Sequence, residues 1–329
     1  MTDTPRTPTL PGSAVAGLFP TPAQPRSTRV GVEQELLAFD AATGAAVDIE
    51  RVRRAVARTP LAGGIAFEPG GQVELNLPCA PGPLELDRCF RTTVSELRRR
   101  CADAGVRLDA APVDPRPLDR VPLQLLSERY LAMQEHFDRI SPAGRRMMRQ
   151  TAGTQVCLDW WPGRAGFEQW RVLLLAGPFL AAALSRSAGP DSRLATWLAV
   201  DPDRTGFDDR LLNGEDPVAA YTAFAAGAAR FVPIGQHLST LFPPVRPRGR
   251  YLEVRFLDGQ PDHLVGRIAG LLADLLYDDD RRRHVLALVA PKQHRLADLW
   301  HTAARTPDVI ADLGHELLGD ASVALAGAA

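Results

Sequence analysis

Four regions of the chain alternate polar and apolar residues, which is the pattern of a β-strand with one buried face. These regions are residues 29–40, 65–78, 151–160 and 250–258. The second region reads as two strands, because Pro69 and Gly70 near its centre suit a type II turn. In the last region Tyr251, Glu253 and Arg255 share one face, and the pattern leaves open whether that face meets water or a substrate.

Longer segments show the apolar spacing of α-helices. The predicted helical segments are residues 84–105, residues 167–187, a segment from about Asp262, and residues 290–329. We expect Gly105 to end the first helix, Gly177-Pro178 to interrupt the second, and Asp262 to cap the third. Residues 1–27 are rich in Pro, Thr and Ala, and they predict a loose tail ahead of a single domain over residues 28–329 with a helical C-terminal part.

The order of these elements predicts the fold class. Strands separated by helices indicate an α+β domain. Their polar and apolar alternation favours an antiparallel sheet with flanking helices, because the strands of a doubly wound parallel sheet are apolar on both faces.

The composition of the chain excludes several classes of function. The net charge is −1, so no overall field favours nucleic acid or a membrane. The four cysteines form no C-x-x-C pair, and the sequence shows no convincing signal peptide or bilayer-spanning run. These features predict a cytoplasmic protein with free thiols. Lys292 is the only lysine, so a Walker A loop is absent, and any phosphate chemistry must rely on arginine, backbone N–H groups and metal.

The polar faces of the predicted strands are rich in carboxylates. They carry Glu33, Glu35, Gln72, Glu74, Asn76, Gln155, Cys157, Asp159, Glu253 and Arg255. Any single strand of this kind is more often a solvated face, but like charges across neighbouring strands destabilise a sheet unless cations neutralise them. Oxygen ligands without a His or Cys cluster favour Mg²⁺ or Mn²⁺. Carboxylates around such an ion, with arginines nearby, suit phosphoryl transfer from ATP.

Five blocks of the sequence, in order, carry a family resemblance. They are GVEQELLAFD, FEPGGQVELNLP, MMRQTAGTQVCLD, RLATWLAVDPDRTG and HLSTLFPPVRPRGRYLEVRFLD. Together they resemble the plant-type glutamate–cysteine ligases, in particular the bacterial branch that supplies γ-glutamylcysteine for ergothioneine. The resemblance runs from about Arg29 to Pro261. It implies the glutamine synthetase and guanidino-kinase fold, a curved antiparallel sheet whose concave face holds metals and substrates.

The resemblance also implies a reaction and a set of site residues. The γ-carboxylate of L-glutamate attacks ATP to give γ-glutamyl phosphate and ADP, and the amine of L-cysteine then displaces phosphate. The implied metal ligands are Glu33, Glu35, Glu74 and Glu253, with Glu68 as a weaker candidate. Glu253 and Arg255 are the implied catalytic residues. Substrate or nucleotide contacts are expected from Gln155, Cys157, Arg193 and Arg204, although surface ion pairs are an equally good interpretation of the last two.

Three departures from the family pattern leave alternatives open. Cys157 stands where the family usually has Asn, the stretch from Tyr221 to His237 is short, and the C-terminal helical region is abbreviated. A γ-glutamyl ligase for a different amine, or a non-catalytic homologue acting as a binding module, therefore stays possible. The sequence defines neither the acceptor amine nor the oligomeric state, and a monomer is compatible with it.

Overall fold

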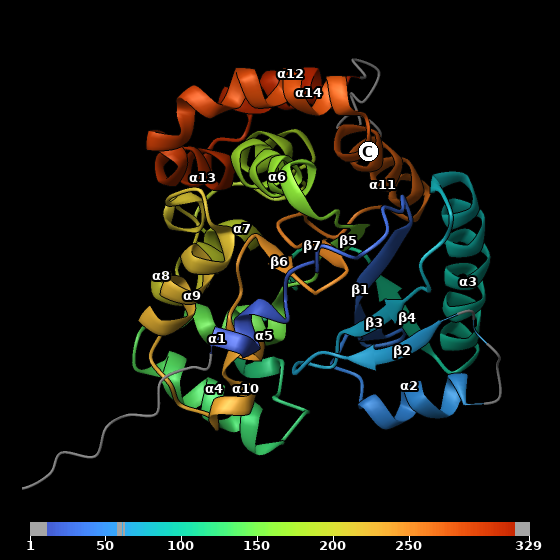
Figure 1. Cartoon of the computed structure of the whole chain (residues 1–329). Coiled ribbons are helices and arrows are strands. Elements are labelled where there is room, and N and C mark those ends of the chain that lie inside the picture. The colour runs from blue at the N-terminus through green and yellow to red at the C-terminus, as the bar shows by residue number, and fades with distance from the viewer. Residues whose placement is uncertain (1–11, 58–60, 62, 320–329) are drawn as a thin grey trace, which may run out of the picture.

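A computed structural model describes residues 12–57, 61 and 63–319. Its centre is a seven-stranded antiparallel sheet with the order β2-β3-β1-β5-β7-β6, and β4 pairs with the far end of β1 (Figure 1). The strands are β1 (Val30–Asp40), β2 (Gly64–Phe67), β3 (Val73–Asn76), β4 (Val106–Asp109), β5 (Thr154–Asp159), β6 (Val245–Pro247) and β7 (Tyr251–Val254). The predicted α+β class with an antiparallel sheet is therefore confirmed.

The strand register gathers the polar residues on one face. Residues that lie opposite each other point to the same side of a sheet, so the register decides which side chains meet. The aligned pairs are Glu35 with Glu74, Glu33 with Asn76, Glu33 with Gln155, and Cys157 with Glu253. The alternation read from the sequence is confirmed on all four of these strands.

The opposite face of the sheet is covered by helices. α3 (Pro83–Asp103) and α11 (Asp262–Tyr277) pack against β1 and against each other, and Val32 and Leu36 of β1 point into this core. A second layer surrounds α6 (Gly163–Ala183), shown at the top of Figure 1. Its helices are α12 (Asp279–Val289), α13 (Leu296–Arg305) and α14 (Asp308–Leu318).

Other helices lie toward the polar face. α4 (Glu128–Asp138), α5 (Ala143–Gln150) and α7 (Arg193–Leu198) contribute side chains that face the carboxylates across a cavity. The remaining helices are α1 (Gly12–Ala16), α2 (Ile49–Val56), α8 (Pro202–Thr205), α9 (Pro217–Gly227) and α10 (Ile234–His237), with short 3-10 turns at 118–120, 210–212, 238–240 and 290–295.

Three local predictions are wrong in detail. The turn after Phe67 has Pro69 and Gly70 at its centre, but the positive φ of 91° is at Gly71, so it is not a type II turn. α6 runs through Pro178 without a break, and its neighbouring helices hold it in place. Asp262 is the first helical residue of α11, where its carboxylate pairs with Arg98 at 2.6 Å, and the cap position is Pro261.

The N-terminal region also departs from the prediction. Residues 12–27 do not form a loose tail, because α1 buries Val15 fully and Phe19 is only 8% exposed. Residues 1–11 of that predicted tail lie outside the described residues. The extent of the single domain over 28–329 stays a prediction. Over the part of the chain that the structure describes, none of the helices combines the length and apolar character needed to cross a bilayer.

Candidate active site

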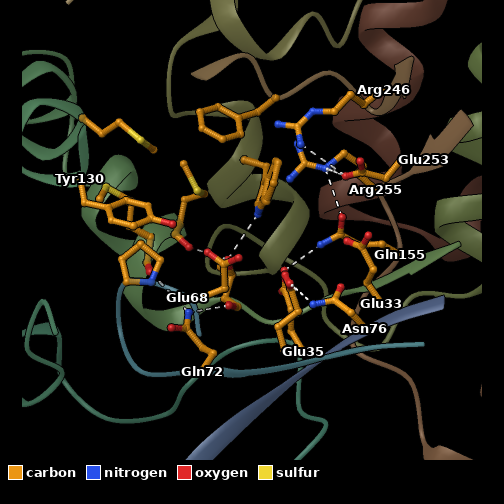
Figure 2. A pocket seen from close by; sticks show the side chains of 18 of the residues that line it. Glu33, Glu35, Glu68, Gln72, Asn76, Tyr130, Gln155, Arg246, Glu253 and Arg255 are labelled. Carbon is orange, nitrogen blue, oxygen red and sulfur yellow. Dashed lines mark hydrogen bonds and ion pairs between the residues drawn. The ribbon is translucent and has the colours of Figure 1, made fainter. Parts of the chain in front are cut away.

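A cavity of about 290 Å³ lies between the polar face of the sheet and helices α4, α5 and α7 (Figure 2). One part of its wall is carboxylates from β1, β3 and the β2–β3 turn. A second part is arginines from β6, β7 and the residues beside them. The third part is apolar and comes from the helices and from Phe242, which lies between the 3-10 turn at 238–240 and β6. Most of the polar positions read from the strands therefore look into one cavity, which answers the question of what the face of β7 meets.

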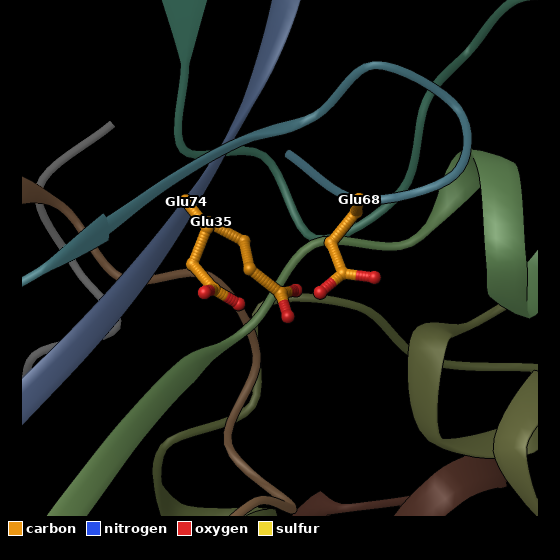
Figure 3. A group of neighbouring side chains, drawn as sticks. All are labelled: Glu35, Glu68 and Glu74. Carbon is orange, nitrogen blue, oxygen red and sulfur yellow. The ribbon is translucent and has the colours of Figure 1, made fainter. Parts of the chain in front are cut away.

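Glu35, Glu68 and Glu74 form the acid cluster, in which one oxygen of each carboxylate lies within 4.8 Å of the others (Figure 3). Glu35 is fixed by the Gly153 N–H at 2.6 Å and by the Gln155 amide at 2.9 Å. Three converging carboxylates form a set of hard oxygen donors suited to Mg²⁺ or Mn²⁺.

The electrostatics of the acid cluster also favour a cation. Burial, followed by repulsion from Glu35 and Glu74, raises the pKa of Glu68 well above its usual range. Burial likewise raises the pKa of Glu35. Glu33 lies beside the cluster, and burial together with Glu253 and Glu74 raises its pKa to about 7. Charged carboxylates are thus disfavoured in this site unless positive charge joins them.

Glu68 lies in the turn between β2 and β3, outside the strand alternation, and two glutamines fix this turn. Gln72 accepts a hydrogen bond from the Gly70 N–H at 3.0 Å and donates to the Thr151 carbonyl at 2.9 Å. Gln124 donates from its side chain to the Gly70 carbonyl at 3.1 Å and from its backbone to the Pro69 carbonyl at 2.7 Å. The turn is therefore held on both sides with Glu68 directed at the other two carboxylates.

The arginine cluster lies at the other end of the cavity and consists of Arg246, Arg248 and Arg255 around Glu253. Glu253 is 2.8 Å from Arg255 Nε, 3.4 Å from Arg248 Nε and 3.6 Å from Arg246 Nη1. Burial would raise the pKa of Glu253, but the three guanidinium groups outweigh burial and lower it. Three cations around one anion leave excess positive charge at this end.

Two guanidinium nitrogens of this cluster lack partners among the described residues. They are Arg255 Nη1 and Arg246 Nε, and both are buried. A buried N–H group without a hydrogen-bond partner is costly, so such groups mark places where a ligand oxygen would be bound. Arg255 also stacks on Trp197 and Phe242, with its guanidinium carbon 5.3 and 5.7 Å from the ring centroids. These contacts hold the arginine in place ahead of any ligand.

The apolar wall lies opposite the sheet, and all of its residues except Phe242 come from helices α4, α5 and α7. It consists of Tyr130, Met133, Met147, Met148, Trp197 and Phe242, and it includes three of the four methionines in the chain. Methionine is flexible and adapts to the shape of its neighbours. Arg129 adds a positive charge beside Tyr130 at the same side of the cavity. This wall closes the cavity opposite the sheet.

Most of the site residues predicted from the sequence line the cavity. Glu33, Glu35, Glu74, Gln155, Glu253 and Arg255 all line the cavity. Glu68, the weaker candidate, belongs to the acid cluster, whereas Glu253 lies among arginines and outside that cluster. The roles of these residues stay predictions, with Glu68 now among the strongest of the metal-ligand candidates.

Three further predicted residues do not line the cavity. Arg193 is 1% exposed and donates to the Arg255 carbonyl at 3.1 Å, behind Trp197. Arg204 is fully buried, pairs with Asp201 and donates to Thr240 Oγ1 at 2.7 Å. Cys157 lies beneath the surface, with its Sγ 3.9 Å from Glu33 Oε1. None of the three is placed to contact a substrate in the cavity directly.

The sequence interpretation missed several lining residues. Arg246 and Arg248 stand in the block PPVRPRG, and their spacing of two residues ahead of a strand was the available signal. Tyr130 and the methionines gave no such signal, because the two helices that carry them were not predicted from the sequence. Arg129 could equally have been a surface residue on sequence grounds.

Comparison with known proteins places this chain in a family. The model of glutamate–cysteine ligase family 2 matches residues 29–308. The glutamate–cysteine ligase EgtA of Mycolicibacterium smegmatis is 30% identical over 291 residues, covering 75% of this chain and 67% of that protein. EgtA of Mycobacterium tuberculosis (strain CDC 1551 / Oshkosh) is 30% identical over 329 residues, covering 84% of this chain and 74% of that protein.

A solved structure supports the fold. A bifunctional glutathione synthetase from Pasteurella multocida superposes with a TM-score of 0.51 at 12% identity, over 96% of this chain and 49% of that one. This chain thus spans about half the length of that relative. The matched span and the two relatives show that the chain belongs to glutamate–cysteine ligase family 2, a family of carbon–nitrogen ligases.

Proposed function

We propose that this protein joins the γ-carboxylate of L-glutamate to the amine of L-cysteine at the expense of ATP. The product, γ-glutamylcysteine, would serve ergothioneine or another low-molecular-weight thiol. The observation that carries the proposal is the pairing, in one cavity, of an acid cluster suited to Mg²⁺ or Mn²⁺ with an arginine cluster suited to anions. Family membership supplies the ligase chemistry.

The acid cluster, the arginines and the apolar wall have different roles in this proposal. Glu35, Glu68 and Glu74 hold the divalent cation, which neutralises phosphate charge when bound. Arg255 and Arg246, with their unpartnered N–H groups, bind oxygens of the transferring phosphate or of a substrate carboxylate. The apolar wall excludes water from the reacting groups, which protects an acyl phosphate from hydrolysis.

The reaction balances in two steps. A γ-carboxylate oxygen of glutamate bonds to the γ-phosphorus of ATP, and the bond to the ADP oxygen breaks. The amine nitrogen then bonds to the γ-carbonyl carbon, phosphate leaves, and the amine loses a proton. Phosphate oxygens carry negative charge throughout, which explains why the site needs both a cation and arginines.

An ADP-release assay with ATP, Mg²⁺ and glutamate tests the proposal, with each amino acid offered as the acceptor in turn. Cysteine should be the preferred acceptor, and hydroxylamine should trap γ-glutamyl hydroxamate with release of ADP. A preference for another amine would support the γ-glutamyl ligase for a different acceptor. Release of AMP and pyrophosphate would overturn the acyl-phosphate mechanism, and no turnover with any acceptor would indicate a binding module.

A further inference from the structure

Residues 12–28, named here the N-terminal strap, pack against the body of the protein beside the arginine cluster. The Phe19 ring lies 4.9 Å from that of Trp160, 6.1 Å from that of Trp170 and 6.0 Å from that of Tyr221, measured between centroids. Val15 is fully buried, and α1 contacts α9. Figure 1 shows α1 in blue and its neighbour α9 in yellow.

Hydrogen bonds fix the strap along its length. Gln24 donates from its side chain to the Trp160 carbonyl at 2.7 Å, and the Trp161 indole donates to the Ser27 carbonyl at 2.6 Å. Ser27 also bonds Asp159 through its hydroxyl. A segment held by side-chain and backbone bonds together with a buried aromatic ring is a built part of the fold.

One strap contact reaches the turn between β6 and β7. The Gly249 N–H donates to the Leu18 carbonyl at 2.8 Å. Gly249 has a φ of 74°, a left-handed backbone conformation that glycine adopts without strain, so glycine suits this turn. The other side of the turn is fixed by the Trp160 N–H, which donates to the Arg250 carbonyl at 2.8 Å.

This turn carries Arg248, whose side chain is 46% exposed and reaches Glu253 at 3.4 Å. A half-exposed arginine is weakly fixed by its own contacts, so the direction of its side chain depends on the backbone that presents it. The turn backbone is closed by the Arg248 N–H, which donates to the Tyr251 carbonyl at 2.9 Å, and it is flanked by the strap and by Trp160. Loosening the strap would therefore release one of the three guanidinium groups at the anion end of the cavity.

We propose that the N-terminal strap is a positioning element of the active site, which holds the turn at residues 248–250 and so presents Arg248 to an anionic group of a substrate. That group is a carboxylate or a phosphate, which share the same recognition chemistry. The inference rests on the proposed function. It assigns Phe19 as the residue through which the strap acts, because its ring makes the main apolar contact.

The test compares Phe19→Ala with Phe207→Ala in the full chain. Phe207 is a matched control, since it is 7% exposed against 8% for Phe19, packs on Trp300, and lies outside the cavity lining. Phe19→Ala should raise the KM of one substrate about threefold to tenfold, the size of one lost hydrogen bond, with a smaller change in kcat. A rise for glutamate identifies the carboxylate, and a rise for ATP identifies the phosphate. Phe207→Ala should leave both KM values unchanged.

A double variant adds a second criterion. Arg248→Gln should raise the same KM as Phe19→Ala, and the combined variant should be no worse than Arg248→Gln alone, because both changes remove one interaction. Additive effects, or equal KM values in Phe19→Ala and Phe207→Ala, would overturn the proposal. Where the alanine variants do not fold, the pair Phe19→Leu and Phe207→Leu replaces them.

Hydrogen exchange separates this proposal from the proposed function. The peptide covering residues 246–252 should exchange faster in Phe19→Ala than in the parent, and should be unchanged in Phe207→Ala. This measurement needs no turnover, so it tests the strap even if the ADP-release assay fails. Unchanged exchange of this peptide in Phe19→Ala would overturn the proposed positioning role of the strap, and it would leave the proposed ligase function intact.

Discussion

At one end of the cavity three glutamates converge on one another, whereas at the other end one glutamate lies among three arginines. Both ends line one cavity on the same face of the sheet, where Glu35 and Glu253 are buried, Glu68 and Glu74 are partly buried and Arg248 is half-exposed. Their charge states nevertheless move in opposite directions, because burial raises the pKa of Glu35 and Glu68 while the arginines lower that of Glu253. Neighbouring charges therefore decide what each end binds.

The comparison has an energetic consequence. The arginine cluster carries excess positive charge, and Glu253 together with the rings of Trp197 and Phe242 holds Arg255 in place, so a ligand anion meets groups that are already placed. The acid cluster contains mutual repulsion that only a cation or protons relieve. We therefore expect metal to stabilise the acid end. Loss of a carboxylate should weaken metal binding, whereas loss of an arginine should lower kcat/KM for the anionic substrate.

The largest effect is expected from Glu68→Gln. Loss of one of three carboxylates should weaken Mg²⁺ or Mn²⁺ binding and lower kcat by roughly a thousandfold, since metal stabilises the transition state by several kcal/mol. The metal-free variant should be at least as stable as the parent, because repulsion is relieved. Titration calorimetry with Mn²⁺ and thermal melting check both parts.

Glu135→Gln is the control for this prediction, since Glu135 is 76% exposed and pairs with Arg139 on the outer side of α4. It should change neither metal binding nor turnover. Unaltered Mn²⁺ affinity in Glu68→Gln would show that the acid cluster is not the metal site.

Arg246→Gln should act on the opposite end. Loss of a buried guanidinium should lower kcat/KM for the anionic substrate by about tenfold to a hundredfold, the size of a charged hydrogen bond. Mn²⁺ affinity should stay unchanged. Arg246→Lys should not restore activity, because an ammonium group lacks the planar fork. Steady-state kinetics with glutamate and ATP varied separately provide the measurement, and weakened metal binding in either variant would mean that the two ends are not independent.

A third prediction concerns the stability of the metal-free protein at different pH values. The pKa of Glu33 is about 7 in the folded state against its ordinary 4.5, so the folded state binds more protons than the unfolded state between these values. Stability in EDTA should therefore fall as pH rises from about 4.5 to 7, by at most roughly 3 kcal/mol for this residue. Glu35 and Glu68 shift in the same direction.

Thermal melts at pH 5.5 and 7.5, with EDTA or with Mg²⁺, measure this effect. The Tm in EDTA should be higher at pH 5.5, and Mg²⁺ should raise the Tm at pH 7.5 more than at pH 5.5. Glu33→Gln should flatten the dependence in EDTA. A Tm in EDTA that rises toward pH 7.5 would show that the acid end is not under electrostatic repulsion.

The two ends also differ in how far the sequence could predict them. The alternation of β1, β3 and β7 was enough to place Glu35, Glu74 and Glu253 on one face, because a period of two fixes the side of a sheet. Glu68 lies in a turn, where no periodicity indicates the direction of a side chain. Its place in the cluster depends on Gln72 and on Gln124, which is 56 residues further along the chain.

Arginines were harder to place than glutamates. Arg204 occupies a polar stretch that suggested an exposed or ligand-binding residue, yet its partners are the Thr240 hydroxyl and carbonyl and the Asp201 carboxylate. Only the tertiary fold brings such partners together. The apolar wall has the same origin, because no helix was predicted over the residues of α4 or α5, and helical spacing does not identify the element against which a helix packs.

The smallest effect is expected from Cys157→Asn, at the position beside both ends. Cys157 faces Glu253 in the β5–β7 register and lies 3.9 Å from Glu33, and its thiol is a weak hydrogen-bond partner. An amide there would donate to a carboxylate and steady it. We expect the KM for glutamate or for the amine to fall about threefold to tenfold, with the Tm nearly unchanged.

Cys101→Asn is the matched control, because Cys101 is fully buried in α3 within the apolar core. An amide without partners there should lower the Tm and leave both KM values unaltered. If Cys157→Asn behaves like Cys101→Asn, the thiol acts only as a small packed hydrophobe and the two ends of the cavity do not depend on it. If it abolishes activity with the native amine while improving activity with cysteine, the residue at this position selects the acceptor, and cysteine is not the natural substrate.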